Sequence, residues 1–163
     1  MTDQIKYFLG TGFYSGLSPV APGTIGSLFA IFIIFGLIQA QLYGLLFAYL
    51  LIAAVISLWV SGYFENKFGE DPGRLVVDEW AGQSLTFIAI SFSDDVQANI
   101  TILVTGFLLF RFFDILKPLG IKKIQSLAGK WGILLDDLLA GFYALICLKS
   151  LIFVGPTIIG WFT

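Results

Sequence analysis

Two pairs of adjacent acidic residues stand beside long apolar stretches of the sequence. Asp136 and Asp137 lie inside a run that is otherwise apolar from residue 131 to 148, and Asp78 and Glu79 stand at the head of another apolar segment. An ionised carboxylate in apolar surroundings costs several kcal/mol unless a cation or a hydrogen-bond donor partners it. Carboxylate oxygens are the ligands that hard divalent cations such as Mg²⁺ prefer. The four acids therefore predict a Mg²⁺ site and supply candidate catalytic groups.

Both acidic pairs are followed by the same small residues. Ala-Gly stands three and four positions after Asp78, and again three and four positions after Asp137. On a helix these small residues share a face with the acid, so a neighbouring helix can approach the metal closely. The alternative interpretation is a solvated pair favoured by a helix N-terminus. It stays open for Asp78 and Glu79, whereas the position of Asp136 and Asp137 within an apolar segment favours a functional role.

A third group of charged residues lies at three-residue steps near a predicted helix end. Arg111, Asp114 and Lys117 form a slanting row, and Pro118 is expected to end the helix at about Lys117. Arg111 and Lys117 suit a phosphate group, while Asp114 could bind the metal, act in catalysis or hold Arg111 in place. The alternative is a basic helix end that extends to the membrane surface with an internal ion pair.

A glycine- and proline-rich stretch precedes the first long apolar segment. Residues 10–27 contain five glycines and two prolines, which predicts an ordered loop rather than a continuous helix, with Thr24 as a helix N-cap. Free backbone N–H groups at a helix N-terminus bind phosphate. The candidate phosphate-binding residues here are Gly23, Thr24, Gly26 and Ser27, although such loops also serve as simple connectors.

The sequence contains no histidine. This absence excludes Ser-His-Asp triads, phosphohistidine intermediates and histidine-ligated zinc. Acidic, basic and hydroxyl side chains with a hard metal must therefore do any chemistry. Together they suggest hydrolysis of a phosphate ester by metal-activated water, with a lipid phosphate as the substrate because the site would open at the level of the lipid headgroups.

The composition indicates an integral membrane protein of one domain, residues 1–163. Apolar residues make up 58%, charged residues 12%, and the mean hydropathy is +0.92, whereas soluble domains carry about a quarter charged residues. The net charge of −2 argues against a nucleic-acid partner. We expect an all-α helical bundle of about five apolar segments. They are residues 28–38, 42–63, 80–92, 99–113 and 131–153, of which the first and third are short enough to be re-entrant.

The basic residues predict the orientation of this bundle. If the N-terminus is cytoplasmic and each segment crosses, eight of the nine basic residues fall on the cytoplasmic side and only Lys149 does not. The predicted loop and both acidic pairs then gather at the cytoplasmic face. The oligomeric state does not follow from the sequence.

Four blocks of the sequence resemble the phosphatidylglycerophosphatase A family of bacteria. They are residues 18–27 (SPVAPGTIGS), residues 71–82 (DPGRLVVDEWAG), residues 110–118 (FRFFDILKP) and residues 132–141 (GILLDDLLAG). The resemblance implies Mg²⁺-dependent removal of the terminal phosphate of phosphatidylglycerophosphate, a phospholipid of the cytoplasmic leaflet, at the bacterial inner membrane. It also implies that Asp71 is a further metal-site residue.

Two rival functions remain as alternatives. Another membrane lipid-phosphate enzyme could use the same acids, but the Asp-x-x-Asp-Gly-x-x-Ala-Arg pattern of phosphatidyl-group transferases is missing. A small cation carrier would place acids deep in the bilayer with access from both sides, and the outward side here offers only Asp94 and Asp95.

Overall fold

The computed structural model describes residues 1–69, 72–125 and 129–162, with side chains up to Val154. This part of the chain is helical and contains no strand, as predicted. In order, its elements are α1 (Thr2–Gly10), the short 3₁₀ helix η1 (Ser15–Leu17), α2 (Pro22–Gln39), α3 (Gly44–Phe68), α4 (Val77–Phe87), α5 (Val96–Leu116), α6 (Ile121–Gln125) and α7 (Lys130–Phe162).

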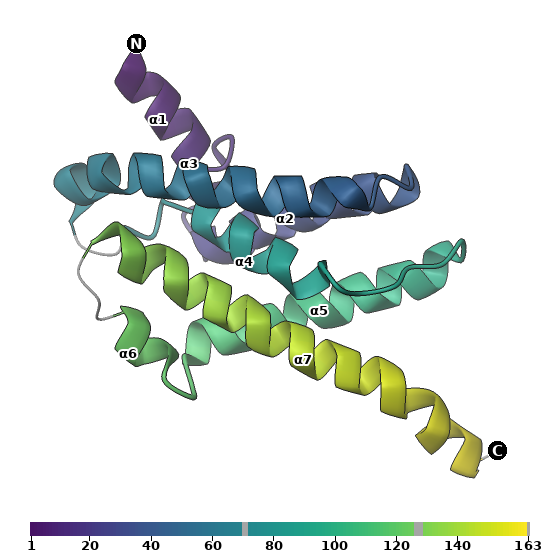
Figure 1. Ribbon diagram of the computed structural model, residues 1–163. Coiled ribbons are helices and arrows are strands. Elements are labelled where there is room, and N and C mark those ends of the chain that lie inside the picture. Colours follow the sequence, from purple (N-terminus) through teal and green to yellow (C-terminus); the bar gives the residue numbers. More distant parts are fainter. Residues whose placement is uncertain (70–71, 126–128, 163) are drawn as a thin grey trace.

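Within the described residues, four helices are long and apolar enough to cross a membrane: α2, α3, α5 and α7. The segment predicted at residues 80–92 is not a fifth such helix. It forms α4, whose 11 residues rise only about 16 Å, against a hydrocarbon core of about 30 Å. After Phe87 the chain continues without helix to residue 95 and reaches the end of the bundle at which α5 begins (Figure 1).

The first apolar segment is longer than its hydrophobic run suggested, because α2 begins at Pro22. Proline is favoured at this first helical position, where its missing N–H is not needed. Ala21, with φ of 46°, is the N-cap, so the prediction of Thr24 as the cap was wrong. The predicted loop over residues 10–27 is likewise partly helical, since η1 and the first turn of α2 fall inside it.

The short helix α4 is the centre of the bundle. Most of its residues are buried, and it packs against α7, α3 and α2. Its closest approach is to α7, because a Cβ placed on Gly82 would lie 2.5 Å from the backbone oxygen of Asp137. A Cβ on Gly141 would in turn collide with the backbone of Gly82. The predicted use of the Ala-Gly steps for close helix packing is confirmed.

One end of the bundle collects the termini of five helices. In Figure 1, α2, α4 and α7 begin toward the side of the view where α3 and α5 end. The N-terminal ends of α4 and α7 and the C-terminal end of α5, which come from distant parts of the sequence, thus lie toward the same end of the bundle. This end carries the candidate site.

Candidate active site

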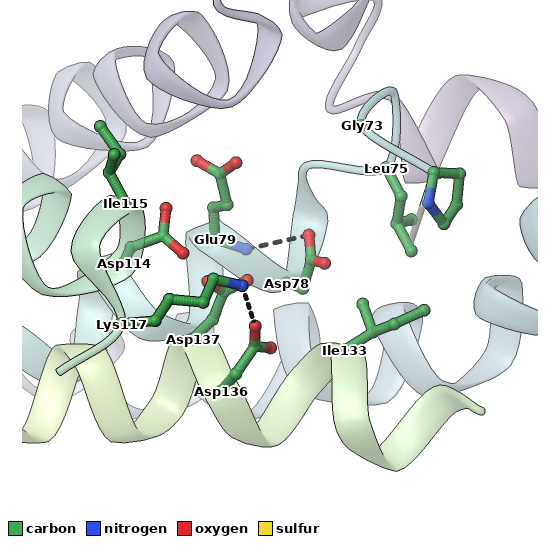
Figure 2. A pocket seen from close by; sticks show the side chains of 11 residues that line it. Gly73, Leu75, Asp78, Glu79, Asp114, Ile115, Lys117, Ile133, Asp136 and Asp137 are labelled. Atoms are coloured by element: carbon green, nitrogen blue, oxygen red, sulfur yellow. Dashed lines mark hydrogen bonds and ion pairs between the residues drawn. The ribbon is translucent and has the colours of Figure 1, made fainter. Parts of the chain in front are cut away.

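A cavity of about 250 Å³ lies between α4, the end of α5 and the start of α7. Figure 2 shows its wall, in which carboxylates from three helices point toward a common space beside the Lys117 ammonium. The lining residues are Pro72, Gly73, Leu75, Asp78, Glu79, Asp114, Ile115, Lys117, Ile133, Asp136 and Asp137. The structure therefore brings together the acidic pair of α4 and the acidic pair of α7, which are almost 60 residues apart in the sequence.

Three of these carboxylates form a tight group. Asp114, Asp136 and Asp137 each offer an oxygen, and the three oxygens lie within 4.8 Å of one another. Asp136 and Asp137 are each only 4% exposed. Because closely spaced carboxylates repel one another in apolar surroundings, the arrangement favours a bound cation.

Lys117 provides one positive charge in the cavity. It is the C-cap of α5 in the left-handed conformation, with φ of 47°, and Pro118 prevents the helix from continuing. Its ammonium forms an ion pair with Asp136. Partial burial lowers the pKa of Lys117, but the hydrogen bond to Asp136 and the neighbouring carboxylates outweigh this effect, so its pKa is raised above the usual value.

Arg111 forms ion pairs with one acidic residue of α4, Glu79, and one of α5, Asp114. Its Nη1 lies 2.6 Å from Glu79 Oε2 and 2.7 Å from Asp114 Oδ2, and it also donates to Ser27 Oγ at 3.3 Å. The Ser27 hydroxyl itself donates a hydrogen bond to Glu79. Since Arg111 is not in the cavity lining, its guanidinium holds Glu79 and Asp114 from behind.

Asp78 lies in the part of the cavity wall opposite Asp114 (Figure 2). It is 5% exposed and accepts a hydrogen bond from the backbone N–H of Glu79 at 3.0 Å. The two members of the pair therefore face different partners, as expected for adjacent residues on a helix. Both side chains line the cavity, and Glu79 is in addition ion-paired with Arg111.

The residues predicted to bind phosphate at the start of α2 do not line the cavity in the described part of the chain. Gly23 lies against the Glu79 carboxylate, with no space for a Cβ between them. Gly26 packs on Val76, and its carbonyl accepts a hydrogen bond from the Trp80 indole at 3.0 Å. Gly23, Gly26 and Ser27 thus position α4, and no contact places Thr24 at the site.

Some residues of the cavity lining were not among the predicted site residues, because their side chains carry no reactive or charged group. Leu75, Ile115 and Ile133 form apolar parts of the wall, and Pro72 and Gly73 complete it. The Pro-Gly step before the acidic pair was a usable signal for a turn at the site. Asp71, which precedes Pro72, lies outside the described residues.

The donor set fits Mg²⁺. Oxygens bound to one octahedral Mg²⁺ at about 2.1 Å lie roughly 3–4 Å apart, so the three carboxylates need only small movements to share an ion. Hard oxygen donors and the absence of histidine match Mg²⁺ better than Zn²⁺.

Fold and site together define a helical membrane protein with a small acid-lined cavity suited to a divalent cation and a phosphate group. The chain belongs to the phosphatidylglycerophosphatase A family, whose model matches residues 8–152. It is accordingly a phosphoric monoester hydrolase.

Individual relatives agree with this assignment. The chain is 33% identical to phosphatidylglycerophosphatase A of Escherichia coli, with 83% of this chain and 76% of the relative covered. It is 36% identical to the Haemophilus influenzae protein of the same name, with 86% and 84% covered. A Bacteroides thetaiotaomicron protein named "Putative phosphatidylinositol-3-phosphatase" is 40% identical, with 96% of both chains covered. No solved structure matches the chain.

Proposed function

We propose that the protein hydrolyses the terminal phosphate monoester of phosphatidylglycerophosphate in a Mg²⁺-dependent reaction, giving phosphatidylglycerol and inorganic phosphate. The observation that carries the proposal is the cavity in which Asp114, Asp136 and Asp137 converge beside Lys117. Family membership and two relatives named for this activity support the substrate.

Asp114, Asp136 and Asp137 would hold the metal. When bound, Mg²⁺ would lower the pKa of a water molecule and offset the charge that develops on the phosphoryl oxygens. The water oxygen forms a bond to phosphorus while the ester P–O bond breaks, and the released lipid hydroxyl takes up a proton. Asp78 lies in the wall away from Arg111, which makes it the candidate to accept the proton from water.

The two basic residues have different tasks in this proposal. Lys117 lines the cavity, so its ammonium can contact the phosphate and orient it. Arg111 keeps Glu79 and Asp114 in place through the contacts described above. In place of the metal-binding role predicted for Glu79, we therefore propose that this residue supports the site. Asp71 stays a proposed metal ligand on the resemblance alone.

The site is proposed to face the cytoplasmic side of the bacterial inner membrane. With the N-terminus in the cytoplasm, eight of the nine basic residues would fall on the side of the membrane that the site faces, in agreement with the positive-inside rule. They are Lys6, Lys67, Arg74, Arg111, Lys117, Lys122, Lys123 and Lys130.

The name of the Bacteroides relative favours a second candidate substrate, phosphatidylinositol 3-phosphate. The test is phosphate release by the purified protein in detergent from phosphatidylglycerophosphate, phosphatidylinositol 3-phosphate and phosphatidic acid. We expect the highest kcat/KM for phosphatidylglycerophosphate, and a loss of turnover when a chelator removes Mg²⁺. Preference for the inositol lipid would replace the proposed substrate, and full turnover in the chelator would exclude the metal mechanism.

A further inference from the structure

The cavity is too small to enclose a phospholipid. Its volume of about 250 Å³ falls below the roughly 300–1,000 Å³ of pockets that enclose a drug-sized molecule. A phosphate headgroup fits in this space, but the acyl chains must lie outside it. The position of these chains therefore depends on which exposed surface joins the cavity.

Ile115 is the apolar side chain that connects the cavity with the exposed surface of the bundle. It lines the cavity, yet it is 63% exposed, whereas the other apolar side chains of the lining, Leu75 and Ile133, are buried. Figure 2 shows it on α5 next to Asp114. Gly73 is the other exposed residue of the lining, and it has no side chain to offer a lipid.

Exposed apolar side chains continue from Ile115 along α5. Phe112, Leu108 and Val104 follow at helical spacing and are 52%, 59% and 51% exposed. With a rise of 1.5 Å per residue, the four side chains extend about 16 Å along the helix. We call these four residues the α5 stripe. It leads from the mouth of the cavity toward the N-terminal end of α5.

We propose that the α5 stripe binds an acyl chain of the substrate lipid while its phosphate occupies the cavity, so that the substrate enters sideways from the bilayer. This inference rests on the proposed function. Helix α3 also carries exposed apolar residues, among them Ile52 and Val55, but no residue of α3 lines the cavity. Helix α7 carries exposed apolar residues such as Phe142 and Ile146, but the residues by which it lines the cavity, Ile133, Asp136 and Asp137, are buried. Continuity with the cavity therefore selects α5, and it restricts the substrate to phosphate monoesters anchored by acyl chains.

The kinetic test compares a lipid with a soluble substrate. Phe112→Ser and Leu108→Ser should lower kcat/KM for phosphatidylglycerophosphate in mixed micelles about tenfold relative to kcat/KM for glycerol 3-phosphate, through KM rather than kcat. Ile52→Ser is the matched control, since Ile52 is 58% exposed on α3, and it should leave this ratio unchanged. Equal effects on both substrates, or the same change in Ile52→Ser, would overturn the inference.

A second measurement keeps the inference separate from the proposed substrate. Phosphatidic acid and phosphatidylcholine, each with a photoreactive diazirine in one acyl chain, are crosslinked to the wild-type protein and the labelled peptides are mapped. The α5 stripe should be labelled more strongly by phosphatidic acid, whose phosphate monoester fits the cavity, while α3 is labelled equally by both lipids. Equal labelling of α5 by both lipids would contradict acyl-chain binding at the α5 stripe, whatever the substrate assay shows.

Discussion

Helices α4 and α7 cross at Gly82 and Gly141, where their backbones are so close that a Cβ on Gly141 would collide with the carbonyl of Gly82. Each glycine lies one turn after an acid of the cavity, Asp78 on α4 and Asp137 on α7. The close crossing of the two backbones is therefore what brings the two acids into one cavity.

Gly141→Ala should destabilise the protein by about 2 kcal/mol or more, because the added methyl group forces two packed backbones apart. Gly62→Ala is the control. No atom lies within 4 Å of a Cβ at that exposed helical position, so alanine should raise stability by about 0.5–1 kcal/mol. Thermal unfolding in detergent measures both variants. If Gly141→Ala unfolds at the wild-type temperature, the close crossing is wrong.

Gly23→Ala should lower turnover at least tenfold, because its Cβ would occupy the position of the Glu79 carboxylate and pull that group away from Arg111. Gly36→Ala changes the same helix where no atom lies within 4 Å, and it should retain wild-type activity. Comparing kcat for the two variants on phosphatidylglycerophosphate separates an effect on Glu79 from an effect on α2. Similar kcat values for the two would exclude a supporting role for Gly23.

Lys117→Met should make the thermal stability depend less on pH at alkaline values. The folded-state pKa of Lys117 is raised above the usual lysine value of 10.5. Its ion pair with Asp136 therefore contributes fully below that pH and is lost as pH rises through the folded-state pKa. The difference in melting temperature between wild type and variant should thus stay constant from about pH 7 to 10 and shrink above. A difference that disappears by pH 9 would contradict the raised pKa.

Mg²⁺ should raise the melting temperature of the wild-type protein, because a ligand that binds only the folded state stabilises it. Asp136→Asn and Asp114→Asn should reduce this shift, since each removes a carboxylate from the group. Asp3→Asn, at the exposed end of α1, should keep it. An Mg²⁺ shift that survives in both cavity variants would place the ion elsewhere.

The sequence was most informative where residue chemistry and spacing coincide. The apolar segments predicted the four long helices α2, α3, α5 and α7. The acidic pairs with their repeated Ala-Gly step predicted the close packing of α4 on α7 and the shared cavity of Asp78 and Asp137. The start of α2 was missed, because a Gly/Pro-rich stretch also suits a helix that begins with proline at its first position.

The support of Glu79 could not be predicted from the sequence. Its contacts with Ser27 and Arg111 join residues 52 and 32 positions apart, and no local pattern specifies such a contact. The short length of α4 could not be predicted either. An apolar segment that is buried on all sides has the same sequence pattern whether it crosses the bilayer or ends inside the bundle.

The most direct test of the metal site is a crystal structure of the protein soaked in Mn²⁺, which takes oxygen ligands like Mg²⁺ and gives anomalous scattering. We predict an anomalous peak in the cavity, within about 2.3 Å of carboxylate oxygens of Asp114, Asp136 and Asp137. A fully occupied Mn²⁺ site elsewhere, with no peak among these three residues, would contradict the central claim.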